Sequence, residues 1–504
     1  MNILVIVGHP RRESLCHALA DHYMQGAAEA GATLRRLDLC DLRFSRDVES
    51  RAMSAQRTEP DIARARRLLS WAHHVVFVYP TWWGTMPSLL KGFLDRVLLP
   101  GFAFRHAENA SGYEGLLRGR SAHLMTTMDT PPAIYRFIYR APGHNAMRRA
   151  TLNFCGIEPV RITPFGSVLG SSPMRRREWL DRARREGREL RGAVPTRGER
   201  FRAKAASWLA ALRLQFYPTT WLVYALGAVA AAGAEALATT AFWIGYLALF
   251  FLEAATVFTN ELYDYSADRS NRRYGPFNGG SRVIIDGRLT AAEMRAGAIA
   301  AFALAVVASL ALVAFPPAPL VSLPLLAVLA VVAIGYTLPP LKLCYRTLGE
   351  LDVALTHGPA VLVCGWVFMG EEWTDPRPWL MALPIALATL PSITLSNVPD
   401  GEADAGAGKW TIAARFGSQR AVDTAVATTI AAALCALVWP FLDAVPDIYA
   451  LVPWFALPHA AWLSWLLLRA HSGTEAPRGT MRPMIASLTY VLWFIVPPLA
   501  ALLI

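Results

Sequence analysis

The sequence has few charged residues and few cysteines for its length. Only 17% of the 504 residues are charged and 54% are hydrophobic, whereas about 25% of residues are charged in typical proteins. This composition excludes an intrinsically disordered chain. The six cysteines are scattered without CxxC spacing, so neither a zinc site nor a disulfide framework is expected. The apolar N-terminal stretch is also short, ending at Gly8-His9-Pro10, so we expect no signal peptide.

Charge is distributed unevenly along the chain. Of the 49 basic residues, 33 precede residue 205, and 12 of these lie between Pro173 and Lys204. The remaining part of the chain is slightly acidic. The basic segment 173–204 is either a solvated helix face or a helix that faces anionic lipid headgroups, because an apolar region follows it directly. Nucleic acid is a less favoured partner, and we expect none.

Apolar runs of about 20 residues, long enough to cross a bilayer, fill the second half of the chain. We count nine, at about 210–232, 237–260, 291–315, 318–338, 349–370, 378–397, 420–441, 447–468 and 484–503. Basic residues follow every second run, whereas the opposite loops carry only Arg377. The positive-inside rule then places the basic loops and the N-terminal part in the cytoplasm. We therefore expect an all-α bundle of nine transmembrane helices in the cell (inner) membrane.

Two acidic clusters follow the second and sixth runs. Their members are four residues apart, as on one face of a helix: Asn260, Asp264 and Asp268, then Asp400 and Asp404. Carboxylates near a membrane interior are costly, and four of them need a cation such as Mg²⁺, which prefers oxygen ligands. Four basic residues nearby suit an anion: Arg272, Arg273, Lys342 and Lys409. The combination fits a diphosphate. The alternative, that the acids merely end two helices in water, is weakened by their occurring twice.

Three motifs of this half, in order, resemble those of the UbiA-type membrane prenyltransferases. They read Asn260-Glu-Leu-Tyr-Asp264-Tyr-Ser-Ala-Asp268, then Tyr336-Thr-Leu-Pro-Pro-Leu-Lys342, then Asp400-Gly-Glu-Ala-Asp404 with Gly408-Lys409-Trp410-Thr411. Glu261 departs from the Asp common at that place. The segment Gly275–Arg282 resembles a loop of the naphthoate and quinone prenyltransferases.

The resemblance covers about residues 208–504 and implies Mg²⁺-dependent transfer of a prenyl group from prenyl diphosphate to an acceptor. The implied metal ligands are Asn260, Asp264, Asp268, Asp400 and Asp404. The four aspartates are also the implied catalytic residues of this half. The implied prenyl diphosphate contacts are Asn260, Arg272, Tyr336, Lys342 and Lys409. An allylic cation would form in the bundle, shielded from water, and an electron-rich ring would attack it.

The first half alternates short apolar strands with helical patterns, which predicts a doubly wound parallel sheet. Strands are expected at Asn2–Val7, His74–Tyr79 and Ala122–Met125. Ligands bind such sheets beyond the carboxyl ends of the strands, where the following loops should converge on one cleft. Ser14 begins a helix suited to a phosphate, and Trp82 and Trp83 suit a planar ligand. For the two tryptophans alone, ordinary packing is the simpler reading.

These loops resemble those of the flavodoxin-like NAD(P)H quinone reductases of the DT-diaphorase kind, over about residues 1–192. The residues on which this resemblance depends are His9 and Ser14, Pro80-Thr-Trp-Trp83 with Pro87–Val97, and Thr126-Thr127 before Tyr135 and His144. The resemblance implies FAD or FMN and NAD(P)H as cofactors. The implied cofactor-binding residues are His9, Ser14, Cys16, Pro80, Thr81, Trp82, Trp83, Thr126, Thr127 and Met128. Tyr135 and His144 would support the reduced flavin and protonate the substrate. Cys16 and Met128-Asp129 depart from the family pattern.

We therefore expect three parts: a reductase domain at 1–172, a basic helix and juxtamembrane linker at 173–207, and a prenyltransferase membrane domain at 208–504. A hydroquinone is a better nucleophile than a quinone, so the reductase is expected to make the aromatic acceptor that the bundle prenylates. The expected partners are prenyl diphosphate, a quinone, hydroquinone or other aromatic acceptor, the bilayer, and a second copy of the reductase domain. One alternative is a membrane-tethered quinone reductase with an inactive bundle. A flavin-regulated transporter would need polar side chains inside the spans away from the two motifs, and the sequence suggests none.

Overall fold

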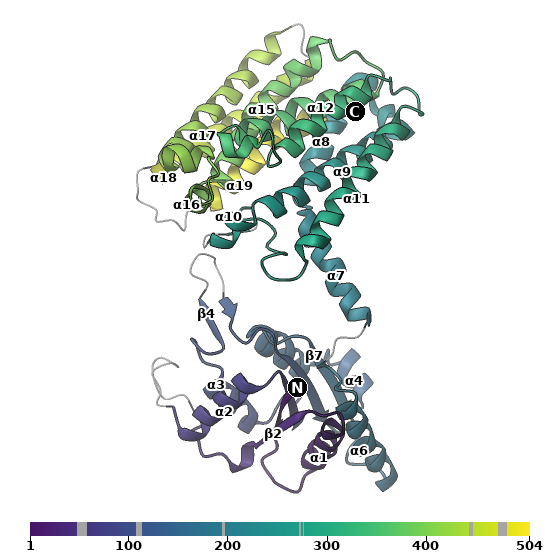
Figure 1. The fold of residues 1–504 in the computed structure, drawn as a ribbon, viewed down its shortest axis with the longest axis vertical. Coiled ribbons are helices and arrows are strands. Elements are labelled where there is room, and N and C mark those ends of the chain that lie inside the picture. Colours follow the sequence, from purple (N-terminus) through teal and green to yellow (C-terminus); the bar gives the residue numbers. More distant parts are fainter. Residues whose placement is uncertain are drawn as a thin grey trace. The chain divides into compact units, whose positions relative to one another are not determined.

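The computed structural model describes residues 1–47, 58–106, 113–193, 197–271, 274–275, 277–442, 447–471 and 481–504. The chain divides into two compact units, Met1–Arg200 and Phe201–Ile504 (Figure 1). Each unit has a hydrophobic core of its own.

A five-stranded parallel sheet forms the centre of the first unit. In spatial order its strands are β2 (Thr33–Asp38), β1 (Asn2–Val7), β3 (His74–Pro80), β6 (Ser121–Thr127) and β7 (Val160–Phe165). All four neighbouring pairs are parallel. β3 and β6 are buried along their whole length, as in parallel sheets covered on both faces. The predicted doubly wound parallel sheet is confirmed, and its strand order is the flavodoxin-like one.

Helices cover both faces of this sheet. α1 (Leu15–Glu29) and α6 (Pro173–Arg188) pack on one face, and α2 (Pro60–Trp71) and α3 (Ser88–Val97) pack on the other. Alternation along the strands explains the division, because successive side chains point to opposite faces of a sheet. In β1, for example, Val5 packs in the core on the α1 and α6 side of the sheet, and Ile6 packs in the core on the α2 and α3 side.

The basic helix α6 packs tightly on α1. A Cβ atom added at Gly26 would lie 1.9 Å from the Arg184 carbonyl oxygen, so only glycine allows this approach. Charge also joins the two helices, because Arg184 Nε and Arg188 Nε donate to the Glu29 carboxylate, each at 2.8 Å. Part of the basic segment is therefore built into the first unit rather than left free.

The second unit is a bundle of helices (Figure 1). Its longer helices are α7 (Arg197–Leu212), α8 (Tyr217–Ala232), α9 (Thr240–Tyr263), α11 (Ala291–Leu312), α12 (Ser322–Gly335), α14 (Val361–Phe368), α15 (Pro376–Ser396), α17 (Ile412–Val438), α18 (Val452–His471), α19 (Met481–Tyr490) and α20 (Val496–Leu503). Short helices α10 (Tyr265–Ser270), α13 (Gly349–Leu355) and α16 (Gly401–Gly406) lie between them. Glycine allows close packing here too, because a Cβ at Gly227 in α8 would lie 2.1 Å from the Leu362 carbonyl oxygen in α14.

Seven helical segments among the described residues are long and apolar enough to cross a membrane. The predicted count of nine is not confirmed. The first and fourth predicted spans correspond to α8 and α12, which have 16 and 14 residues, fewer than the roughly 20 that a full crossing needs. Gly233, with φ of 71°, ends α8, and prolines surround α12 in the sequence.

Buried neutral histidines make the first unit sensitive to acid. His74 is fully buried, its Nδ1 lies 2.8 Å from Ser121 Oγ, and burial lowers its pKa from 6.5 to about 3. His74 of the unfolded chain therefore binds a proton below about pH 6.5, whereas His74 of the folded unit stays neutral down to about pH 3. The free energy of unfolding therefore falls as the pH drops through this range.

We expect His74→Gln to reduce this loss of stability on acidification. The measurement is urea-dependent labelling of the buried thiols of Cys16 and Cys155 in the full chain, compared with the wild type at each pH from 7 to 4. Cys364, which is buried in the second unit, serves as the internal control. An identical pH dependence in variant and wild type would contradict the prediction.

Candidate active sites

One cavity in the second unit is lined by residues from all three sequence motifs. The predicted residues that line it are Asn260, Asp264, Asp268, Tyr336, Asp400 and Lys409. They come from the end of α9, from α10, and from the segments that follow α12, α15 and α16. Helices of the bundle supply the remaining walls with apolar side chains such as Leu249 and Leu329. The fold thus brings together charged groups that are far apart in the sequence.

The four-residue spacing of the acidic motifs corresponds to helical turns. Asp264 N donates to the Asn260 carbonyl, and Asp268 N donates to the Asp264 carbonyl, both at 2.8 Å. Asp404 N and the Asp400 carbonyl repeat this bond at 2.8 Å. Asp264 stands at the junction where α9 ends and α10 begins. Both motifs therefore present their carboxylates from short turns at the ends of long helices.

Among the described residues, Lys409 forms the ion pairs with these carboxylates. Its Nζ donates to Asp264 Oδ2 at 2.7 Å and lies 3.7 Å from Asp404 Oδ1. All three side chains are almost completely buried. Lys409 thus links the first acidic motif to the second, and the carboxylates keep the pKa of its ammonium group well above the usual value despite burial.

A glycine-containing loop closes over the second motif. Asp400 Oδ1 accepts hydrogen bonds from Asn271 Nδ2 and Asn278 Nδ2, both at 2.7 Å, and Oδ2 accepts one from Gly279 N at 3.1 Å. Gly280 has a φ of 67°, and a Cβ there would lie 2.2 Å from Asp268 Oδ2. The roles of Asn271 and Asn278 were missed by sequence reasoning, although the resemblance of the Gly275–Arg282 segment pointed to this loop.

The donor set fits a hard divalent cation. Burial and the neighbouring carboxylates raise the pKa of Asp268 to about 8, and burial raises that of Asp404 to about 7. Asp404 Oδ2 and Asn260 Oδ1 are buried and lack hydrogen-bond partners within the described part of the chain. No three His, Cys, Asp or Glu side chains among the described residues lie close enough together to hold a metal ion. The site therefore offers oxygen ligands with unmet charge rather than a closed metal cage.

Two of the predicted residues do not line this cavity, and a third lies outside the described residues. Asp404 and Lys342 are not among the described residues that line the cavity. Lys342 Nζ lies 5.1 Å from the ring centre of Tyr345, whose hydroxyl is 3.5 Å from Asp264 Oδ1. Arg272 and its neighbour Arg273 lie outside the described residues.

Polar groups that sequence reasoning missed also line the cavity. Glu253 in α9, Asp352 in α13 and His357 just after α13 lie within apolar helical segments and line the same cavity. The expectation that the spans are free of polar side chains away from the two motifs is therefore wrong. The position of Glu253 could have been inferred from the sequence, because it lies seven residues before Asn260 and so shares the same helix face.

A second cleft lies in the first unit, beyond the carboxyl ends of β1, β3 and β6. The predicted residues that line it are His9, Ser14, Cys16, Pro80, Thr81, Trp82, Thr127 and Met128. Ser14 caps α1, its side chain accepting from His17 N, so the helix N-terminus faces the ligand side as an anion site requires. Thr81 Oγ1 is buried and has no partner among the described residues, which leaves a hydrogen bond for a ligand to make. The cleft thus fits a phosphate-bearing planar cofactor.

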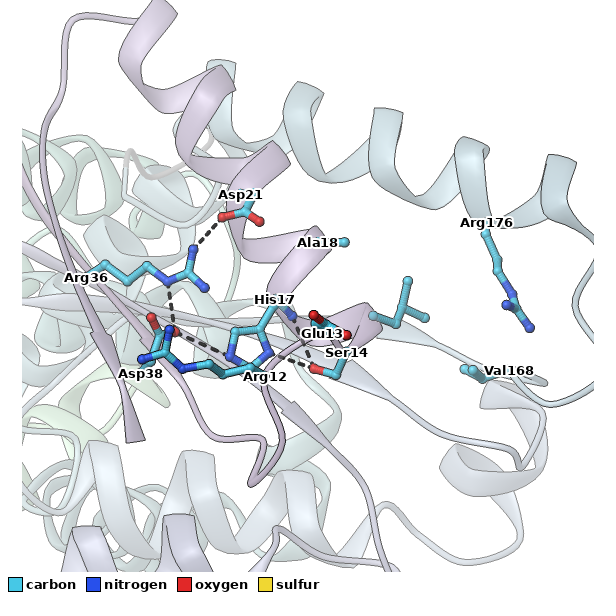
Figure 2. Close-up of a pocket in the computed structure, with 11 residues that line it drawn as sticks. Arg12, Glu13, Ser14, His17, Ala18, Asp21, Arg36, Asp38, Val168 and Arg176 are labelled. Carbon is cyan, nitrogen blue, oxygen red and sulfur yellow. Dashed lines mark hydrogen bonds and ion pairs between the residues drawn. The ribbon is translucent and has the colours of Figure 1, made fainter. Parts of the chain in front are cut away.

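An adjoining pocket continues along α1 (Figure 2). His17 lies between two partners there, with Nδ1 2.8 Å from Ser14 Oγ and Nε2 3.6 Å from Asp38 Oδ1. Burial lowers the pKa of His17 and raises that of the Cys16 thiol to about 12, so neither a cationic imidazole nor a thiolate is favoured here. These groups act as neutral hydrogen-bonding partners.

Tyr135 and His144 form a connected pair. Tyr135 in α4 (Pro132–Phe137) donates from its hydroxyl to the Gly84 carbonyl at 2.8 Å. His144 in α5 (Pro142–Asn145) stacks edge-on against the Tyr135 ring at 4.9 Å, and its Nε2 lies 2.9 Å from Thr126 Oγ1. Burial lowers the pKa of His144 to about 4 and raises that of Tyr135, so both are neutral at pH 7. Trp83 is fully exposed. Four predicted residues are not among the described residues that line the cleft: Trp83, Thr126, Tyr135 and His144.

Family comparisons assign each unit separately. Residues 1–190 match the model of the flavodoxin-like fold family, and residues 220–495 match that of the UbiA prenyltransferase family. An uncharacterized NAD(P)H oxidoreductase of Haemophilus influenzae is 30% identical over 33% of this chain and 85% of its own length. The human ribosyldihydronicotinamide dehydrogenase [quinone] is 32% identical over 23% of this chain, and the match spans about half, 51%, of that protein.

A solved UbiA homologue from Aeropyrum pernix K1 has a TM-score of 0.47 at 16% identity, covering 57% of this chain and 98% of its own. The family matches and the seven apolar segments make this a multi-pass membrane protein. The chain therefore belongs to the UbiA prenyltransferase family, and the predicted fusion is confirmed, because its first unit is a flavodoxin-like domain of the NAD(P)H oxidoreductase kind.

Proposed function

We propose that the second unit transfers a prenyl group from a prenyl diphosphate to an electron-rich aromatic acceptor. The observation that carries the proposal is the cavity that combines Asn260, Asp264, Asp268, Asp400 and Lys409 at one place with apolar side chains such as Leu249 and Leu329 in other parts of its lining. An anionic headgroup with an apolar chain has the same distribution of polarity. Family membership supports the assignment independently.

The proposed ligands of Mg²⁺ are the four aspartates, with Asn260 completing or orienting the set, because their oxygens match the preference of this ion. Mg²⁺, when bound, would supply positive charge that stabilises the departing diphosphate. Lys409, Lys342, Tyr336 and Arg272 are the proposed diphosphate contacts. The loop that holds Asp400 through Asn278 and Gly279 would position that carboxylate before substrate arrives.

The proposed reaction exchanges one bond for another. The bond between C1 of the prenyl group and the diphosphate oxygen breaks with its electron pair leaving on the diphosphate. A bond forms from a ring carbon of the acceptor to C1, and that ring carbon loses its proton to solvent. Apolar walls such as Leu249 and Leu329 exclude water, which would otherwise capture the electron-deficient chain.

For the first unit we propose reduction of a quinone to its hydroquinone by NAD(P)H. A flavin, FAD or FMN, would accept the hydride of NAD(P)H and pass it to the quinone. His9, Ser14, Thr81 and the loop at Thr127-Met128 would hold the cofactor, with the α1 N-terminus at its phosphate. The Tyr135–His144 pair, anchored on Thr126, would donate hydrogen bonds and a proton beside it.

We further propose that the two activities are sequential. A quinone is electron-poor and a weak nucleophile, whereas its hydroquinone is electron-rich, so reduction prepares the ring for prenylation. The same proposal includes a reductase domain at residues 1–172, a basic linker at 173–207 and a membrane domain at 208–504. It also includes a cytoplasmic position of the first unit, which the basic loops of the membrane half support. A tethered reductase with an inactive bundle is less favoured, because it would not explain why aspartates of both motifs and Lys409 line one cavity.

Asp264→Asn and Asp400→Asn are each expected to abolish prenyl transfer in purified full-length protein, because each removes a charged metal ligand. The measurement is product formation from a radiolabelled prenyl diphosphate with Mg²⁺ and an aromatic acceptor. NAD(P)H-dependent quinone reduction by the same preparations should be unchanged, which controls for the amount of protein and for the folding of the first unit. Full prenyl transfer by both variants would refute the assignment.

Lys409→Met is expected to destabilise the second unit when Mg²⁺ is absent, since it leaves Asp264 and Asp404 buried without their counter-charge. Breaking one partner of a buried ion pair costs about 3–5 kcal/mol. Thermal unfolding in detergent is the measurement, with Lys342→Met as the matched control, because Lys342 lies over the Tyr345 ring and forms no ion pair with a described residue. Millimolar Mg²⁺ should restore part of the loss in Lys409→Met. Equal stability of the two variants would contradict the role given to Lys409.

Prenylation of an added quinone is expected to require NAD(P)H, whereas prenylation of the chemically reduced hydroquinone is not. A Tyr135→Phe, His144→Asn double variant should lose most prenylation of the quinone and keep that of the hydroquinone. The products can be identified by mass spectrometry under anaerobic conditions. Equal prenylation of the quinone with and without NAD(P)H would remove the coupling.

A further inference from the structure

Two acidic side chains line the bundle cavity away from both aspartate motifs. Glu253 lies seven residues before Asn260 in α9, which is about two turns or about 10 Å along the helix. Asp352 lies in the first turn of α13, a different wall of the cavity. Neither residue belongs to the motifs proposed to hold the metal and the diphosphate.

Both carboxylates have unmet hydrogen-bonding capacity. Asp352 is only 5% exposed, and its Oδ1 is buried without a partner among the described residues. Glu253 Oε2 is likewise buried and without a partner in the described part of the chain. A buried carboxylate oxygen that accepts no hydrogen bond is costly, so such oxygens inside a membrane bundle mark a place suited to a donor.

The cations of the cavity are engaged elsewhere. Lys409 donates to Asp264 at 2.7 Å. Arg213 donates to the Phe277 carbonyl at 3.3 Å and lies over the ring of Phe216, 4.9 Å from its centre. No ion pair joins either cation to Glu253 or Asp352 among the described residues. A ligand with O–H groups would supply the donors that these two oxygens lack among the described residues.

We propose that Glu253 and Asp352 form the acceptor subsite and bind the hydroxyl groups of an aromatic diol or phenol, an inference that rests on the proposed function. Carboxylates accept hydrogen bonds from O–H donors and repel anions, so this subsite selects hydroxylated rings over rings that carry a carboxylate. A hydroxyl that donates to a carboxylate also gains electron density, which makes the ring a better nucleophile. The hydroquinone expected from the first unit has this character, and its quinone, which lacks O–H donors, does not.

The test uses full-length protein in lipid nanodiscs with Mg²⁺, one prenyl diphosphate and three acceptors kept reduced. The acceptors are 1,4-naphthalenediol, its dimethyl ether and the 2-carboxylated diol. The wild type should prefer the diol. Glu253→Gln and Asp352→Asn should each raise the KM for the diol about tenfold or more, the usual weight of a hydrogen bond to a charged group. Both should also reduce the discrimination against the carboxylated ring, while the KM for prenyl diphosphate and the Mg²⁺ dependence stay the same.

Glu235→Gln is the matched control, because Glu235 is an exposed carboxylate on the connection between α8 and α9. Thermal unfolding checks that each variant folds. Equilibrium binding of the diol, measured without prenyl diphosphate, separates the two hypotheses. Loss of diol binding in the variants, with no transfer by the wild type, would retain the subsite and reject the proposed function. Unchanged diol binding and KM in both variants would overturn the subsite whatever the activity, as would an equal rise in the KM for both substrates.

Discussion

The cost of burying carboxylates in an apolar bundle governs the membrane unit. Asp264 and Asp404 are almost completely buried and lie close to Lys409, whereas the partly buried Asp400 accepts hydrogen bonds from Asn271, Asn278 and a backbone amide. Burial raises the pKa of Asp268 to about 8, and the neighbouring carboxylates add to the rise despite the presence of Lys409. A divalent cation bound here would supply positive charge that favours both the ionised carboxylates and an anionic diphosphate.

Much of this arrangement could be predicted from the sequence, because it depends on local periodicity. The i, i+4 spacing of Asn260, Asp264 and Asp268 persists as consecutive helical turns, and alternating strands and helices in the first half gave the correct parallel sheet. Apolar content located the helices, but the count of nine full spans is not confirmed among the described residues. Hydropathy does not reveal where glycine or proline ends a helix such as α8.

What could not be predicted depends on contacts between distant segments. The bonds from Asn271 and Asn278 to Asp400 join residues more than a hundred positions apart. Asp352 looks in sequence like an acid at the start of a helix, and only the fold places it in the cavity wall. In the first unit the anchoring of His144 on Thr126, 18 residues away, likewise needed the loop after β6 to be folded.

The two units are related by chemistry even though they were recognised separately. A reductase that forms hydroquinones yields rings with two O–H donors, and the bundle cavity contains carboxylate oxygens without a hydrogen-bond partner among the described residues. The same carboxylates would be poor partners for a quinone, whose oxygens only accept hydrogen bonds. Selection of the reduced ring by Glu253 and Asp352 would therefore make prenylation follow reduction without any contact between the two units. Fusion then raises the local concentration of the product of one site at the other.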